Sequence, residues 1–295
     1  MGLVFTSFIP ATNAVAPVDH AAFDKLLKKH VTAKGLVDYK GFKADEKEFN
    51  NYLEALSKNP TTDNAPKNEQ MAYWINAYNA YTIRLILDHY PVKSIKDIGP
   101  KNQIPFVNTP WAKKFFTIGG SKMSLDNIEH GTLRKKYNDP RIHFALVCAS
   151  ISCPTLRNEA YTAAKLDAQL DDQGRDFLND PAKNHVGSEQ AQLSKLFLWY
   201  KADWQANGQS VMNWVNRYAT GKLTLIRRLR FWTMTGRLTS NKFRLCLHFF
   251  RSKQTASGFS CVCLSIHLIV KSRCQTRLLF LFLPGPLPMM PPGNA

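Results

Sequence analysis

Apolar residues recur at helical spacing in several parts of the chain. Phe23, Leu26 and Leu27 share one face of residues 21–30, which predicts an amphipathic helix. The long helix that begins near Asn68 is expected to end before Pro91, because proline cannot continue a helix. The remaining predicted helices cover residues 46–56, 159–178, 192–201 and 209–219.

Two short segments follow other patterns. Gly119, Gly120 and Ser121 separate two short apolar runs, which predicts a tight hairpin, and Ser124 then has the character of an N-cap for a helix reaching about Lys136. Residues 142–148 are a short apolar run that predicts a buried strand. Helices dominate without a repeated βαβ rhythm, so we expect an α+β fold, a mainly helical single domain with a small sheet or hairpin.

The charge of the chain is distributed unevenly. Eleven of the 39 Lys and Arg residues lie in 223–295, which contains no Asp or Glu, so residues 1–222 carry 28 basic against 22 acidic residues. A nucleic-acid interface places its basic residues within a folded module, so nucleic acid is not expected as a partner. The expected organisation is a signal-peptide remnant at 1–16, a domain at 18–222, and an unrelated tail without fixed structure at 223–295.

The first residues are apolar and end in Ala14-Val15-Ala16, which resembles a signal-peptide cleavage site. No apolar stretch reaches the ~18 residues of a membrane span. We therefore expect a periplasmic or secreted protein without a transmembrane segment. In such a compartment the two cysteines of the domain, Cys148 and Cys153, can form a disulfide.

Polar residues in apolar surroundings are the candidates for chemistry. Asn76 and Asn79 lie three apart on the long helix, where buried amides must be paired with neighbouring backbone or face a site. Glu129 and His130 are adjacent, so a regular helix would point them about 100° apart. On a regular strand His143 would face away from Cys148, which makes His143 a structural residue rather than the partner of that thiol.

These residues allow two interpretations of Cys148, which stay open here. The thiol can be a nucleophile if a histidine or a helix N-terminus lowers its pKa, or it can be half of a Cys148–Cys153 disulfide that closes a small loop. The spacing of the cysteines and histidines is not diagnostic of zinc, so neither a metal nor another cofactor is expected.

Several ordered motifs resemble the family of domain-of-unknown-function 547 over roughly residues 20–220. They are Asn76-Ala-Tyr-Asn79, Ser94-Ile95, Ile128-Glu129-His130 with Leu133-Arg134, Pro140-Arg-Ile-His-Phe followed by Cys148 and Cys153-Pro154, and Ser194-Lys-Leu-Phe197-Leu-Trp199-Tyr200 with Asp203. The resemblance implies an exported bacterial or a eukaryotic protein, at times fused to glutaredoxin-like modules, with no firmly assigned reaction. Its recurrent His and Cys positions correspond to His130, His143, Cys148 and Cys153.

The sequence supports three functions. The first is a cysteine-dependent hydrolase or acyl transferase, loosely papain- or transglutaminase-like, acting on a peptide or a cell-envelope component. Cys148 would be the nucleophile and His130 the base, oriented by Glu129 or another carboxylate, with Cys153 and His143 as the second choices. Asn76 or Asn79 would supply an oxyanion or an orienting hydrogen bond. The second is a non-catalytic exported binding module with one disulfide, and the third is thiol–disulfide chemistry. The sequence indicates no oligomeric state.

The tail allows a specific hypothesis about the gene. A one-base shift in reading frame lets residues 231–236 be read as Leu-Asp-Tyr-Asp-Trp, similar to the Tyr-Asp-Trp ending associated with the family above. A frameshift between about Lys222 and Arg230 would explain why acidic residues vanish from the tail.

Overall fold

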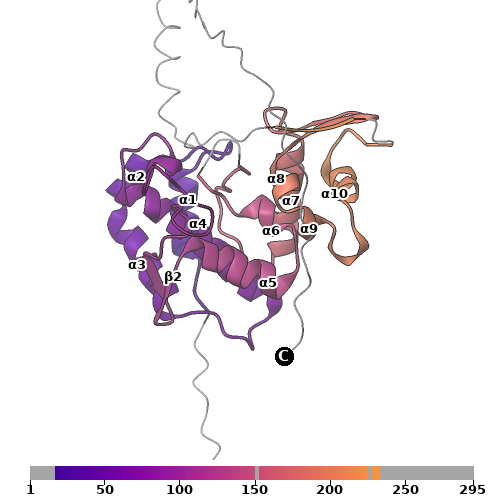
Figure 1. Cartoon of the computed structure of the whole chain (residues 1–295). Helices are drawn as coiled ribbons and strands as arrows, with labels where there is room; N and C mark the ends of the chain where they lie inside the picture. The colour runs from indigo at the N-terminus through magenta and orange to yellow at the C-terminus, as the bar shows by residue number, and fades with distance from the viewer. Residues whose placement is uncertain (1–16, 150–152, 225–227, 233–295) are drawn as a thin grey trace, which may run out of the picture. The chain divides into compact units, whose positions relative to one another are not determined.

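The computed structural model describes residues 17–149, 153–224 and 228–232 (Figure 1). The α-helices are α1 (Ala21–His30), α2 (Tyr39–Ala44), α3 (Glu46–Lys58), α4 (Lys67–Asp88), α5 (Arg134–Tyr137), α6 (Ile142–Ala145), α7 (Leu166–Leu178), α8 (Leu196–Trp199), α9 (Lys201–Trp204) and α10 (Val211–Tyr218). The remaining helical elements are the 3₁₀ turns η1 (Ile95–Asp97) and η3 (Ala206–Gly208) and the π-helix η2 (Asn127–Leu133). The strands are β1 (Phe116–Ile118), β2 (Ser121–Met123), β3 (His185–Val186), β4 (Gln190–Ser194) and β5 (Arg228–Trp232).

Helices and two small sheets make up an α+β fold, as predicted. The predicted helices at 21–30, 46–56 and from 68 onwards correspond to α1, α3 and α4. The predicted hairpin is the antiparallel pair β1–β2, whose turn residues Gly119 and Gly120 both have positive φ, a conformation that glycine adopts without steric cost. None of the helices in the described ranges is long and apolar enough to cross a membrane.

Helix α4 is the central element of the fold. It is buried on nearly all sides, as expected of a helix that other elements surround, and it packs with α1, α3 and the hairpin in one hydrophobic cluster. A second cluster joins α7, α8 and α10 around the buried side chains of Phe144 and Trp204. In Figure 1 the helices α1–α4 and the helices α6–α10 lie on opposite sides of the picture.

The structure corrects the prediction of a strand at 142–148. Residues Ile142–Ala145 form the single helical turn α6, and Leu146 leaves it with extended backbone. A short apolar run is compatible with either conformation when it is buried on every side, as Ile142 and Phe144 are here. The alternation that placed His143 and Cys148 on opposite faces therefore does not apply.

A three-stranded sheet was not anticipated. Its order is β3-β4-β5, with β3 antiparallel and β5 parallel to β4, so part of the helix predicted at 192–201 is strand. Strand β5 lies inside the segment 223–295, for which no fixed structure was expected, and that expectation is wrong for Arg228–Trp232. Residues 1–16 and 233–295, with the expected cleavage site and most of the tail, lie outside the described residues.

Candidate functional site

A cavity of about 500 Å³ lies where the two hydrophobic clusters meet. Its walls come from α4, η1, the loop before β1, η2, α6, the segment that follows α6, and α8. Most of the lining is apolar, and a few charged side chains converge on it, as is typical of small-molecule sites. Glu129, His130, His143, Cys148 and Cys153, all predicted as site residues, line this one cavity.

One face of the helical segment η2–α5 brings three ionisable residues to the cavity wall. Asp126, His130 and Arg134 are spaced by four, which places them on the same side of a helix. Arg134 donates a hydrogen bond from a terminal guanidinium nitrogen to His130 Nδ1 at 2.9 Å, and His130 Nε2 lies 3.9 Å from the Asp126 carboxylate. The segment includes a π-helix, a rare form that is frequent at functional sites.

The Arg134 bond fixes the protonation of His130. Because a guanidinium can only donate, it occupies the Nδ1 lone pair, and a neutral imidazole then carries its proton on Nε2. Burial lowers the pKa of His130, and the charges of Arg134 and His143 lower it further, against the opposing effect of Glu129. His130 is therefore a neutral N–H donor rather than a ready proton acceptor.

His143 has the complementary arrangement. Its Nε2 is 2.7 Å from Asp203 Oδ2, while Nδ1 lies 3.9 Å from Glu129 Oε1, beyond hydrogen-bond distance. Although burial raises the pKa of Asp203, its hydrogen bonds with Arg134 and His143 hold that pKa well below the usual value. An ionised Asp203 accepts a hydrogen bond from the His143 Nε2–H, and the tautomer that this bond selects has its lone pair on Nδ1.

Asp203 also binds the guanidinium group of Arg134. Arg134 donates to both carboxylate oxygens of Asp203, at 2.6 and 2.7 Å, a bidentate pair of the strong kind. The Tyr200 ring stacks on His143 at 3.7 Å between centroids and lies 5.1 Å from the Arg134 guanidinium carbon. Both histidines are thus oriented by one carboxylate, His143 directly and His130 through Arg134.

Glu129 faces phenols and His143 rather than His130. Burial raises the pKa of Tyr78 and of Tyr200, and the neighbouring Glu129 carboxylate raises both further. The two phenols therefore stay protonated as donors near this carboxylate. The sequence predicted that Glu129 or another carboxylate orients His130, and in the structure Arg134 and the Asp126 carboxylate are the groups beside the His130 ring nitrogens.

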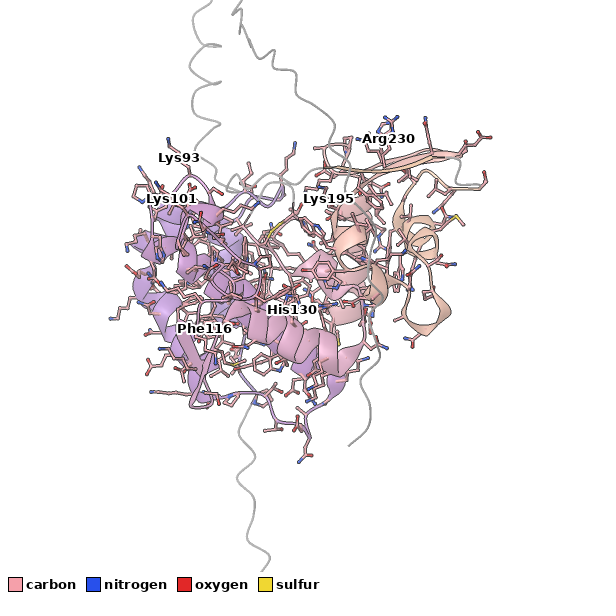
Figure 2. All side chains as sticks on the ribbon, in the orientation of Figure 1. Lys93, Lys101, Phe116, His130, Lys195 and Arg230 are labelled. Atoms are coloured by element: carbon pink, nitrogen blue, oxygen red, sulfur yellow. A yellow bond between two sulfur atoms is a disulfide. The ribbon has the colours of Figure 1, made fainter. Side chains whose placement is uncertain are left out.

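Cys148 and Cys153 form a disulfide in the cavity wall, drawn as a yellow bond in Figure 2, where His130 is labelled. Their Cα atoms are 6.3 Å apart. Cys148 is partly exposed, whereas Cys153 is buried. The thiol of Cys148 is unavailable in this form, and Cys148 is the more accessible sulfur of the pair.

Asn76 and Asn79 do not line the cavity but hold backbone around it. Asn79 donates from Nδ2 to the Ala145 carbonyl and accepts from the Val147 amide, which fixes the chain just before Cys148. Asn76 clamps the backbone of Tyr161 in the same two-sided manner. In the structure both amides satisfy buried backbone groups, one of the two alternatives considered for them.

The sequence analysis did not assign roles to Asp126, Arg134, Tyr200 or Asp203. Asp126, His130 and Arg134 follow one another at intervals of four residues. This spacing was visible in the sequence and could have grouped the three residues. Asp203 is 60 residues from His143, and only its place in a motif marked it. Within the described ranges, no group of three or more His, Cys, Asp or Glu side chains is arranged to hold a metal ion.

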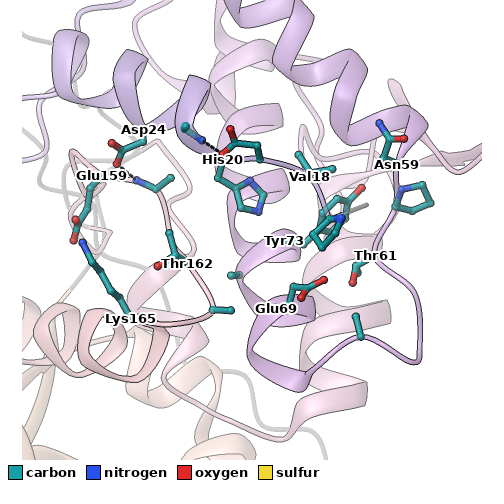
Figure 3. A pocket seen from close by; sticks show the side chains of 18 of the residues that line it. Val18, His20, Asp24, Asn59, Thr61, Glu69, Tyr73, Glu159, Thr162 and Lys165 are labelled. Carbon is teal, nitrogen blue, oxygen red and sulfur yellow. Dashed lines mark hydrogen bonds between the residues drawn. The ribbon is translucent and has the colours of Figure 1, made fainter. Parts of the chain in front are cut away.

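A second cavity of about 480 Å³ lies beside the start of α1 and α4 (Figure 3). Its polar groups serve the packing of the fold. His20 Nδ1 is 2.8 Å from the Tyr52 hydroxyl, Asp24 accepts from the Ala160 amide, and Tyr73 donates to the Leu56 carbonyl. Burial lowers the pKa of His20 to about 4, against the opposing effect of Asp19. The predicted histidines, cysteines and Glu129 lie at the first cavity, which is the candidate site.

The fold and the site together define a helix-rich α+β domain with an acid–base cavity next to a cysteine pair. Residues 62–178 match the family described as "Protein of unknown function, DUF547". This match confirms, over those residues, the resemblance predicted from the motifs; the motif from Ser194 to Asp203 lies outside it. No curated protein and no solved structure matches the chain.

Proposed function

We propose that the domain is a thiol-dependent hydrolase or acyl transferase whose nucleophile is Cys148, released when the Cys148–Cys153 disulfide is reduced. The observation that carries the proposal is that Cys148 shares one cavity with two histidines of opposite hydrogen-bonding character. A thiol enzyme needs both characters, a base for the nucleophile and a donor for the oxyanion.

The first step is reduction. An external dithiol exchanges with the disulfide, so that Cys148 and Cys153 become thiols and the dithiol becomes a disulfide. Cys148 is the accessible sulfur and Cys153 the buried one, which favours Cys148 as the group that then meets a substrate.

The acyl-transfer step uses the different tautomers of His143 and His130. His143 Nδ1 takes the proton of the Cys148 thiol as sulfur attacks the acyl carbonyl, and Asp203 stabilises the imidazolium formed. The His130 Nε2–H donates to the carbonyl oxygen as negative charge develops on it. The bond to the leaving group breaks with return of the proton from His143, and water or another acceptor then releases the acyl group. His143 thus takes the base role that the sequence analysis gave to His130.

Paired cysteine variants test the proposal because they remove the same disulfide. With a para-nitrophenyl ester and a panel of peptide amides as probes, the wild-type full chain should turn over substrate only after reduction. Cys153→Ser should be active without reductant, and Cys148→Ser should be inactive with or without it. Equal activities of the two folded variants would contradict the proposal.

A non-catalytic binding module is the second candidate, and the disulfide itself favours it, because one bond closes the loop between residues 148 and 153. In that case both variants lose stability and neither gains a thiol-dependent activity. Thiol–disulfide exchange gives a third pattern, since the exchange reaction requires both cysteines. Each single-cysteine variant would then lose this activity or stop at a mixed disulfide.

Export to an oxidising compartment is part of the proposal. A disulfide in the domain and the Ala14-Val15-Ala16 pattern support it. Mass spectrometry of the protein from fractionated cells should find a periplasmic or secreted form that begins at Pro17. Recovery of the protein only from the cytosol, with both cysteines reduced, would contradict it.

A further inference from the structure

Large exposed hydrophobic side chains lie on two segments that border the candidate site. In the described part of the chain they are Ile104, Phe106, Val107, Leu198 and Trp199. They come from two segments, the loop before β1 and the end of α8, and each segment also supplies a cavity-lining ring, Phe106 and Trp199. We call these five side chains the apolar rim. Exposed apolar groups beside a cavity are typical of interaction sites.

The loop that carries three of the five side chains of the apolar rim is held in a defined conformation. Asn108 accepts from the Ile104 amide at 2.5 Å and donates to the Asn102 carbonyl at 3.0 Å. Phe106 has a φ of 62°, in the left-handed region that a bulky side chain rarely adopts. Its ring is 69% exposed and stands edge-on to the His130 ring, with centroids 5.0 Å apart. Strain of this kind concentrates at functional sites.

The interior of the cavity continues the apolar surface inward. Leu146 and Leu196 line it, together with the disulfide. Lys96 also lines the cavity, and no ion pair of its ammonium group is found among the described residues. A molecule that fills this space therefore meets apolar side chains along its length. At polar positions it meets the Lys96 ammonium, the His130 N–H and the ionisable side chains of Asp126, Glu129 and Arg134.

From this continuity we infer that the site takes carboxylic acid derivatives with a large apolar acyl group, whose chain lies against Phe106 and Trp199. The inference rests on the proposed acyl-transfer function and names its substrate class. An apolar chain seated on the rim places its carbonyl carbon toward the His130 and Cys148 side of the cavity. A membrane surface is the competing occupant, but it would not reach the part of each ring that lines the cavity.

Binding can be tested without turnover, because the oxidised wild-type protein has no free Cys148 thiol. Titration calorimetry with butyrate, hexanoate and octanoate is the measurement. Burial of each methylene should strengthen binding by about three- to fourfold, so the series should rise steeply with chain length. Affinity independent of chain length would overturn the inference.

Two rim variants and one matched control locate the binding. Phe106→Asn removes the ring while keeping a residue that tolerates positive φ, and Trp199→Gln removes the other ring. Each should weaken octanoate binding by about tenfold. Lys101→Gln, an exposed change in the same loop, should leave it unchanged. Unchanged octanoate affinity in both rim variants would contradict the assignment.

Two further outcomes separate this inference from the proposed function. Sedimentation with phosphatidylcholine vesicles that depends on Phe106 and Trp199, without octanoate binding, would overturn the inference in favour of a membrane contact. Chain-length-dependent octanoate binding combined with an inactive Cys153→Ser variant would leave the apolar site in place and refute only the thiol chemistry.

Discussion

The Nε2 atom of His143 donates a hydrogen bond to the carboxylate of Asp203 across 2.7 Å, and this bond links the α6 turn to α9. The same carboxylate accepts two hydrogen bonds from Arg134. The position of both histidines therefore depends on one residue of α9.

Asp203→Asn should destabilise the protein by about 2 kcal/mol near neutral pH, because hydrogen bonds to charged groups contribute roughly 1.5–3 kcal/mol. The sign of the pH dependence follows from the lowered pKa of folded Asp203. The stabilisation is present above the unfolded pKa of about 3.9 and is lost as the pH falls through the lower folded value. Urea unfolding of both proteins should show a difference that shrinks below pH ~4.

Asp172→Asn is the matched control for this prediction. Asp172 pairs with Arg175 on the surface, where ion pairs contribute little. Its removal should change the free energy of unfolding far less than Asp203→Asn does. A comparable loss in the two variants would show that the Asp203 bonds are not special to the site.

Arg134→Met should raise the pKa of His130 and allow the neutral ring to carry its proton on either nitrogen. Arg134 is one of the charges that lower this pKa, after burial, and it also occupies Nδ1. Two-dimensional ¹H–¹⁵N NMR of the imidazoles should show the proton on Nε2 in the wild-type protein and a mixture in the variant. The resonances of His185, exposed in β3, provide an internal reference. A wild-type His130 protonated on Nδ1 would refute its assigned role as a donor.

The ionised form of Asp126 is predicted to lower the stability of the folded protein at alkaline pH. Burial and, after it, the nearby charge of Glu129 raise the pKa of Asp126 to about 6. A raised folded pKa means that stability is fully present below the unfolded value of about 3.9 and declines as the pH rises through about 6. Asp126→Asn should therefore be more stable than the wild-type protein at pH ~8, with the advantage vanishing near pH ~4.

Exposed Asp176→Asn serves as the control for that comparison, measured as the melting temperature across the same pH range. An Asp126→Asn variant that is less stable than the wild-type protein at pH ~8 would indicate that an ionised Asp126 makes a favourable contact, with the His130 Nε2–H as the nearest donor.

Local patterns in the sequence were enough for α1, α3, α4 and the β1–β2 hairpin. Their apolar spacing and their turn residues act over a few positions, so sequence neighbours specify them. Residues Ile142–Ala145 were assigned to a strand because a run buried on every side has no period to distinguish helix from strand. Strand β5 pairs with β4 in parallel and 38 residues away, a contact that no local pattern encodes.

The candidate site, like the fold, could be predicted from the sequence only in part. The motifs identified Glu129, His130, His143, Cys148 and Cys153, and the fold brings all five to one cavity. Their pairing could not be read from the sequence, because His143 is paired with the carboxylate of Asp203, 60 residues further along the chain. Glu129 was one carboxylate considered for orienting His130, whereas the spacing of four in the helix makes Asp126 and Arg134 its neighbours.

The two asparagines of α4 provide a matched test of what positions Cys148. Asn76 and Asn79 are both buried, and each clamps one stretch of backbone with a donated and an accepted hydrogen bond. Asn76→Ala and Asn79→Ala should each destabilise the protein by about 2–4 kcal/mol, since each leaves two buried backbone groups unpaired. Only Asn79 holds the segment that leads into Cys148, so only its loss should also displace the thiol.

The measurement is the rate at which iodoacetamide alkylates Cys148 in the reduced, folded proteins, at a temperature where both variants are fully folded. We expect Asn79→Ala to change this rate severalfold relative to the wild-type protein, and Asn76→Ala to leave it within about twofold, because the Tyr161 backbone that Asn76 holds does not line the cavity. Asn79→Asp gives a further check, since it keeps the acceptor for the Val147 amide but loses the donor to the Ala145 carbonyl. Identical alkylation rates in all the variants would mean that the disulfide loop, and not α4, sets the position of Cys148.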